Sequence, residues 1–214
     1  MSQRIDTSNV LYFAKVIARN SGKLLDRSVD FYNSLLQLDP DTEKQIHLEM
    51  GARHERNGQY QDAIHAYDKI LSSEPDNVAV LLRIAKLHTR LCQLGRSLEI
   101  LKKITALDNT NAEAFYLLGS AHFSVDESDE SLTALNRAIA LHPGNAEAYY
   151  KLGLIHDAMF SLDLSIEAYH NAITFKPDFV KAYQSLGFAY EAKGMRDEAV
   201  KYFRKSLELS EQNW

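Results

Sequence analysis

Four histidines recur in this sequence at a fixed interval of 34 residues: His54, His88, His122 and His156. Histidine is a common zinc ligand, and a zinc ion needs its nitrogen ligands at about 2 Å. The interval places the four rings on successive helices, and helices in contact lie about 8–10 Å apart. Histidines a whole interval apart therefore cannot share one ion. We predict histidines packed between helices and no metal site, and we expect protonation below about pH 6 to loosen that packing.

A second group of metal-binding side chains is acidic. Asp126, Glu127, Asp129 and Glu130 fall within one short stretch, and carboxylates are the usual ligands of calcium. A calcium loop of the EF-hand type alternates its ligands around a central glycine, and this stretch has no such glycine. It therefore predicts a solvated acidic turn.

The sequence contains no motif that assembles a catalytic site. It has no nucleophile–base motif, no glycine-rich phosphate loop and no His-Glu-x-x-His segment. The single Cys92 excludes an internal disulfide and a cysteine-paired metal site, and predicts a small filler between helices. We expect neither an enzyme nor a cofactor.

The elements that carry the histidines repeat as a unit. Leu152-Gly153 lies midway between two further Leu-Gly pairs, each 34 residues away, and Pro143 and Pro177 share one phase. Such a period indicates a stack of identical supersecondary units. Small residues recur wherever two helices of a unit must approach: Gly51, Ala85, Gly119, Gly153 and Gly187 in the first helix, and Ala63, Ser97, Ser131, Ser165 and Ala199 in the second.

One unit carries Tyr149, Leu152, Gly153, His156, Ser165, Tyr169, Ala172 and Pro177. This pattern resembles the tetratricopeptide repeat. The resemblance implies an all-α fold, a right-handed α-solenoid of helix-turn-helix repeats. It divides the chain into a degenerate N-terminal repeat or cap, residues 1–43, and five tandem repeats in 44–214, namely 44–77, 78–111, 112–145, 146–179 and 180–213.

The resemblance also implies a binding surface, because the first helix of every unit lines the concave wall of such a solenoid. The residues that it assigns to this peptide-binding groove are Leu48, Leu82, Lys86, Tyr116, Ser120, Phe123, Tyr150, Leu154, Asp157, Gln184 and Phe188. Tyrosine offers rigid contact area and one polar group, so we expect peptides or helices with apolar anchors to bind, with Tyr150 as the hot spot. In the alternative, Tyr116 and Tyr150 only pack against adjacent helices. Tyr116 and Ser120 replace the Lys and Asn that clamp chaperone C-termini in some family members, so that clamp is absent.

Two further apolar features stand outside the groove. The first helix of the N-terminal repeat is apolar nearly all round. Either this helix folds back as an atypical cap, or it docks on another molecule. Docking predicts a self-assembly segment of Leu11, Tyr12, Phe13, Val16 and Ile17. Met159-Phe160 replaces the glycine of a helix–helix turn and is either folded back or part of a contact surface. The last helix is expected to present Tyr202 and Leu209 outward, to solvent or another subunit.

Composition limits the partners. The net charge is −5 and basic residues are scattered, so nucleic acid is not the expected ligand. The sequence has no run of about 18 apolar residues that would span a membrane and no N-terminal secretion pattern. The layout resembles magnetosome-associated tetratricopeptide scaffolds. That likeness implies a cytoplasmic scaffold, itself among its own partners, peripheral to an organelle (magnetosome) membrane through other proteins. An assembly factor or secretion chaperone that shields a hydrophobic client segment is the alternative.

Overall fold

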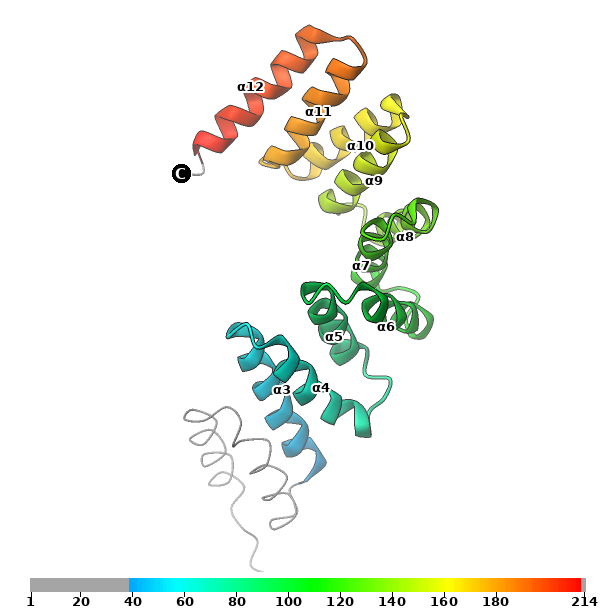
Figure 1. Cartoon of the computed structure of the whole chain (residues 1–214), viewed down its shortest axis with the longest axis vertical. Coiled ribbons are helices and arrows are strands. Elements are labelled where there is room, and N and C mark those ends of the chain that lie inside the picture. Colours follow the sequence, from blue (N-terminus) through cyan, green and yellow to red (C-terminus); the bar gives the residue numbers. More distant parts are fainter. Residues whose placement is uncertain (1–38, 213–214) are drawn as a thin grey trace, which may run out of the picture. The chain divides into compact units, whose positions relative to one another are not determined.

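The computed structural model describes residues 39–212, and within this range the chain forms ten helices and no strand (Figure 1). The helices are α3 (Pro40–Arg56), α4 (Tyr60–Ser73), α5 (Val78–Arg90), α6 (Leu94–Leu107), α7 (Ala112–Phe123), α8 (Ser128–Leu141), α9 (Ala146–Ala158), α10 (Leu162–Phe175), α11 (Val180–Ala192) and α12 (Arg196–Gln212). They fall into two compact units, Met1–Val80 and Leu81–Trp214. The predicted self-assembly segment lies outside the described residues.

Asparagine side chains begin several first helices. Asn111 and Asn145 accept hydrogen bonds from the backbone N–H groups of Ala114 and Ala148, each at 3.0 Å. An N-cap of this kind satisfies one of the N–H groups that the first helical turn leaves without a partner. The 34-residue spacing of these asparagines therefore fixes where these two units start.

A residue with a left-handed backbone closes the turn between the two helices of each pair. These residues are Gly58, Cys92, Asp126, Phe160 and Gly194, with φ between 56° and 81°. The prediction that Cys92 fills a gap between helices is wrong, because Cys92 is exposed at this turn position. Since a side chain there points into solvent, its size is not limited by packing.

The two helices of a pair approach closely at the predicted small residues. Ser131 Oγ, fully buried on α8, donates a 2.7 Å hydrogen bond to the Gly119 carbonyl oxygen on α7. Ser97 Oγ on α6 makes the corresponding 3.0 Å bond to Ala85 on α5. Serine at this position therefore satisfies its hydroxyl while it keeps the helices close.

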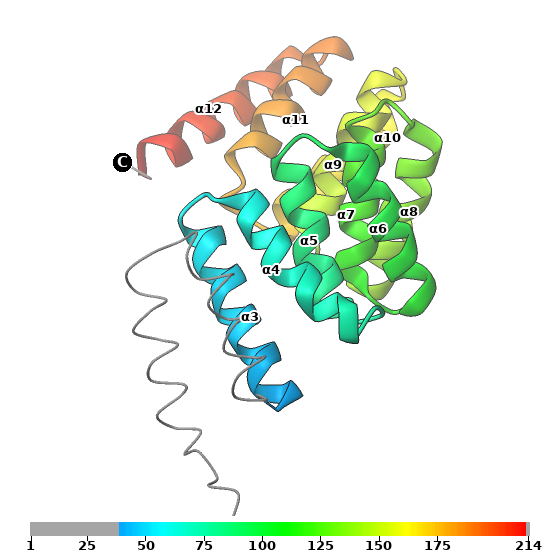
Figure 2. The ribbon, with the colours of Figure 1, turned by 60° about the horizontal axis from the view of Figure 1, so that its bottom comes forward.

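In the second unit the helices form two layers. The first helices α7, α9 and α11 contact one another in order, and each second helix, such as α8 or α10, packs against the first helix that follows it (Figures 1 and 2). Leu135, Leu152 and Ile155 form one core between the layers, and the next core continues with Tyr169 and Leu186. The predicted all-α solenoid fold is confirmed.

The first unit repeats this construction in α3 and α4. Asp39 caps α3 by accepting a 3.0 Å hydrogen bond from Thr42 N. Lys44 Nζ lies 2.7 Å from a carboxylate oxygen of Glu74 and so ties the start of α3 to the residue that follows α4. Leu48, a predicted groove residue, is half-buried on α3. In the segment 39–212, no helix is both long and apolar enough to cross a membrane.

The expectation for the outer side of the last helix is wrong for Leu209. This residue is only 9% exposed, whereas Val200 and Leu207 on α12 are 55% and 63% exposed. Tyr202 is half-buried and stacks on Tyr190 of α11, with ring centroids 5.3 Å apart. Val200 and Leu207 therefore form the apolar surface that α12 leaves in solvent.

Candidate binding surface on the first helices

The periodic histidines stabilise turns. His54, His88 and His122 are buried, and the Nδ1 atom of each hydrogen-bonds the side chain five positions later, Gln59 at 3.1 Å, Gln93 at 2.7 Å and Glu127 respectively. That partner residue also returns its backbone N–H to the histidine carbonyl. The prediction of packed histidines is confirmed for these three, whereas His156 is half-buried. Among residues 39–212 no three His, Cys, Asp or Glu side chains are grouped to hold a metal ion.

Most of the predicted groove residues lie on the first helices of the second unit. We call this surface the first-helix face and define it by the predicted residues on α5, α7, α9 and α11. Lys86 Nζ on α5 lies 2.6 Å from a Glu113 oxygen on α7, and Phe123 on α7 contacts Lys151 on α9. Lys86 and Phe123, two predicted groove residues, therefore each contact the first helix that follows their own.

Two tyrosines on this face are half-buried. The Tyr150 ring lies 5.8 Å from Tyr169 and 4.9 Å from Phe179, measured between centroids. Tyr116 packs against the core around Leu152, and burial raises the pKa of its hydroxyl. Both rings therefore pack against neighbouring helices and still leave part of their surface accessible.

The remaining predicted residues differ in exposure. Phe188 is 61% exposed and meets Phe203 edge-to-face, with centroids 5.0 Å apart. Gln184 is exposed, and Leu82, Ser120 and Leu154 are half-buried. Asp157 accepts hydrogen bonds from Ser165 Oγ at 3.2 Å and from the Tyr169 hydroxyl at 3.3 Å, so its carboxylate connects α9 to α10.

Lys151 is a residue of this face that the sequence analysis missed. It lies four residues after Glu147 and three before Leu154, so helical geometry places it beside both. Its Nζ lies 5.4 Å from the centroid of the Phe123 ring, and burial lowers the pKa of its ammonium group. A helical projection of α9 would have found it, whereas the family positions taken from the resemblance pass over it.

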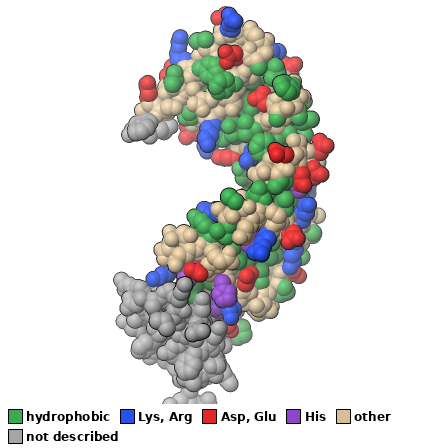
Figure 3. Space-filling view, viewed as in Figure 1, with side chains coloured by type: hydrophobic (Ala, Val, Ile, Leu, Met, Phe, Trp, Pro, Cys, Tyr) green, Lys and Arg blue, Asp and Glu red, His purple; other side chains and the backbone are tan. Residues whose placement is uncertain are grey.

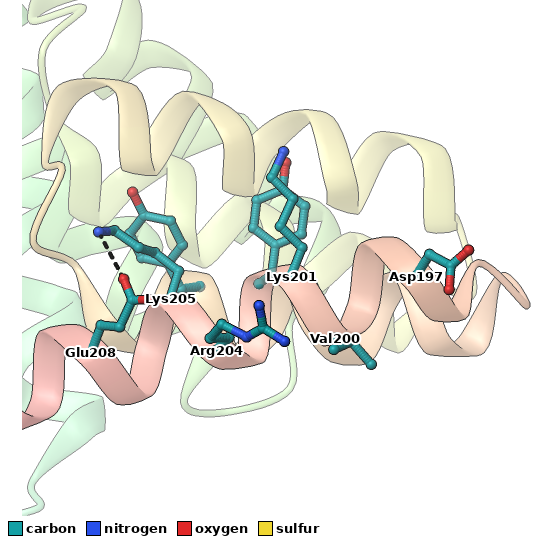
Figure 4. Close-up of a pocket in the computed structure, with 8 residues that line it drawn as sticks. Asp197, Val200, Lys201, Arg204, Lys205 and Glu208 are labelled. Atoms are coloured by element: carbon teal, nitrogen blue, oxygen red, sulfur yellow. Dashed lines mark hydrogen bonds and ion pairs between the residues drawn. The ribbon is translucent and has the colours of Figure 1, made fainter.

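A pocket between α11 and α12 is lined mainly by residues of α12. Lys201, Arg204 and Lys205 project from successive turns of α12, and a Lys205 Nζ–Glu208 oxygen distance of 3.3 Å marks one ion pair (Figure 4). Charges of both signs therefore line it. Over the second unit, basic side chains are likewise interspersed among acidic ones on the face shown in Figure 3.

Comparison with known proteins agrees with this fold. Family models of the tetratricopeptide repeat match residues 56–121, 127–159, 146–179 and 180–213. A crystal structure of MamA is 49% identical, covers 76% of this chain and 95% of its own, and has a TM-score of 0.72. A second MamA structure is 48% identical, covers 79% and 93%, and has a TM-score of 0.72.

A more distant structure, MamA from Desulfovibrio magneticus RS-1, is 25% identical, covers 79% of this chain and 96% of its own, and has a TM-score of 0.74. No curated protein matches the sequence at a significant level. The chain belongs to the tetratricopeptide repeat family of protein-interaction scaffolds, and it is similar to MamA in both sequence and fold.

Proposed function

We propose that this chain is a MamA-like scaffold that binds a peptide or helical segment of a partner protein along the first-helix face, the concave wall in this family. The observation that carries the proposal is the run of accessible aromatic side chains on three successive first helices: Tyr116 on α7, Tyr150 on α9 and Phe188 on α11. Aromatic side chains are enriched among the residues that dominate binding energy.

The surroundings of these rings suit an apolar segment with a few polar contacts. Lys86 and Glu113 already pair at 2.6 Å, and Lys176 and Glu147 at 2.8 Å. Because these charges are satisfied within the chain, a partner gains little by contacting them. The rings offer contact area that neighbouring helices hold in place, so little conformational entropy is lost on binding.

Tyr150 is the proposed hot spot. Its truncation in Tyr150→Ala should weaken binding by about 2 kcal/mol, or about thirtyfold. The probe is a peptide selected on the full chain from a phage-displayed library of random 12-residue peptides, and the readout is its Kd by calorimetry. The matched control is Tyr149→Ala, because Tyr149 lies next in sequence but stacks on Phe175 at 5.5 Å. Equal losses in the two variants would contradict the proposal.

The scaffold also self-assembles, in this proposal, through residues Leu11, Tyr12, Phe13, Val16 and Ile17. The support is the nearly all-round apolar character of that stretch, which exposure to solvent would not favour. Light scattering after size-exclusion chromatography should give large homo-oligomers for the full chain and a smaller species after deletion of residues 1–41. An equally oligomeric deletion variant would show that the segment is only a cap on its own chain.

A peripheral location on the cytoplasmic side of a magnetosome membrane, reached through protein partners, completes the proposal. Its support is the 49% identity to MamA over 95% of that chain. A fluorescent fusion expressed in a magnetosome-forming bacterium should follow the magnetosome chain and should be released from isolated magnetosomes by high salt or alkali. A diffuse signal would contradict this location.

The second candidate function is an assembly factor or secretion chaperone. The 61% exposure of Phe188 favours it, because a ring that is solvent-exposed in the free protein suits a transient apolar client. A monomer or dimer that changes its assembly state only when a client peptide is added would favour this function over the scaffold.

A further inference from the structure

Lys151 differs from two nearby lysines, Lys86 on α5 and Lys176 at the end of α10. Lys86 is paired with Glu113 at 2.6 Å, and Lys176 with Glu147 at 2.8 Å. The Lys151 ammonium instead lies over the Phe123 ring, 5.4 Å from its centroid. Within residues 39–212 the structure gives this ammonium no carboxylate partner.

The carboxylates of α9 are already engaged. Glu147 accepts the 2.8 Å hydrogen bond from Lys176, which holds the pKa of its carboxyl group below the usual range. Asp157 accepts hydrogen bonds from Ser165 and Tyr169. Neither acid is free to neutralise Lys151 on its own helix.

A half-buried cation that contacts an aromatic ring has fewer favourable electrostatic partners than it has in water. The ring face attracts the ammonium group, but a neutral ring replaces only part of the lost hydration. Burial correspondingly lowers the pKa of Lys151, because it removes water from the charged form. A carboxylate that approaches this point can accept charge-assisted hydrogen bonds from the Lys151 ammonium group.

We propose that Lys151 binds a carboxylate side chain, an Asp or Glu, of the partner segment that docks on the first-helix face. The proposal rests on the proposed function and names the chemistry of the partner: an acidic residue flanked by apolar or aromatic ones. The flanking residues would contact Phe123 on one side of Lys151 and Tyr150 on the other.

The face continues past Lys151 in both directions. Tyr116 lies on the preceding first helix and Phe188 on the following one. A segment that contacts both rings crosses α9, the helix that carries Lys151. The carboxylate is therefore assigned to a side chain and not to a C-terminus.

The test uses the full chain and a phage library of random 12-residue peptides fused at their C-termini, which presents no free C-terminal carboxylate. Peptides selected on the wild type should be enriched in Asp or Glu between apolar residues. Selection on Lys151→Met should lose this enrichment, and Lys151→Arg should retain it. A selected peptide should bind Lys151→Met about tenfold more weakly than it binds the wild type, and its Glu→Gln version should bind both proteins equally.

Lys201→Met is the matched control, because Lys201 also lies over a ring, 5.5 Å from the Tyr202 centroid, but on α12. It should leave selection and affinity unchanged. Two results would overturn the assignment of Lys151: selected peptides without acidic enrichment, or the same enrichment on Lys151→Met as on the wild type. In either case, binding that still depended on Tyr150 would uphold the proposed function. A failure to select any peptide that depends on Tyr150 would contradict the proposed function, and the role of Lys151 with it.

Discussion

The ring of Tyr169 lies so close to Gly153 that a Cβ atom on this glycine would be 2.3 Å from the ring Cε1 atom. Gly51 meets Tyr67 at the same distance, and Gly187 meets Phe203 at 2.5 Å. A small residue on the first helix and a ring on the second therefore set the separation of the two helices. The first-helix face depends on this contact, because Tyr169 also supports Tyr150.

Gly153→Ala should destabilise the protein by about 1–3 kcal/mol, since the ring of a fully buried tyrosine must move to admit the methyl group. The measurement is the free energy of unfolding by urea. Gly95→Ala is the matched control, because Gly95 lies in α6 with no atom within 4 Å of an added Cβ. Alanine there should be neutral or stabilising by up to about 1 kcal/mol. Equal effects at the two sites would mean that the Gly153–Tyr169 contact does not set the helix spacing.

Phe160 occupies the left-handed turn position with φ of 56° and is 88% exposed. Phe160→Gly should raise the free energy of unfolding by about 0.5–1 kcal/mol, because the ring packs little in the free protein and glycine adopts this conformation without strain. Gly194→Ala, at φ of 81° with no atom within 4 Å, should lower it by about 1 kcal/mol. Thermal denaturation of both variants tests this, and a destabilised Phe160→Gly would reveal packing by the ring.

His170 should make stability depend on pH. Burial lowers its pKa, and the charge of Lys201 adds to the effect. The neutral ring is therefore preferred in the folded protein, where its Nε2 atom lies 3.0 Å from the Tyr190 hydroxyl oxygen. Since the unfolded chain takes up the proton first, this contribution is complete above about pH 6.5 and is lost as the pH falls toward the folded-state pKa.

The Tm of the wild type should therefore fall between about pH 7.5 and pH 5.5, and by more than the Tm of His170→Gln. The exposed His65 supplies the control, since His65→Gln should keep the wild-type slope. Parallel curves for the wild type and His170→Gln would exclude this role for His170.

Asn145→Ala should cost about 1 kcal/mol of stability, because the Asn145 side chain caps α9 through its bond to Ala148 N. Ser161 precedes α10 in the same way, but its side chain makes no capping bond. Ser161→Ala should therefore change the free energy of unfolding by no more than about 0.5 kcal/mol. Equal losses of stability in the two variants would contradict the capping role of the Asn145 side chain.

The 34-residue period predicts the fold because small residues at helix contacts and glycines at turns recur with the same spacing. Gly153 and Ser165 mark the helix contacts, and Gly58 and Gly194 mark left-handed turns, as the structure shows. The same logic failed for Cys92, whose phase matched a glycine but whose residue type suggested a core position. For a turn residue such as Cys92, the position in the repeat unit therefore predicts the environment better than the residue type does.

Side-chain partners were harder to predict. The bond between His88 and Gln93 joins residues five positions apart across a turn, a spacing without a helical or strand periodicity. Leu209 is buried although Leu207 and Glu208, the two residues before it on α12, are exposed. The position of Lys151 on α9 could have been predicted from a helical projection, but its contact with the Phe123 ring of another helix could not. These features arise from tertiary contacts that one-dimensional patterns do not contain.

The most direct measurement is photo-cross-linking of a selected peptide to the full chain with benzoylphenylalanine at position 188 or at position 207. Phe188 on α11 and Leu207 on α12 are 61% and 63% exposed, so the two probes have matched accessibility. Binding along the first helices predicts efficient cross-linking from position 188 and little from position 207. Equal cross-linking from both positions, or cross-linking from position 207 alone, would contradict a partner site on the first-helix face.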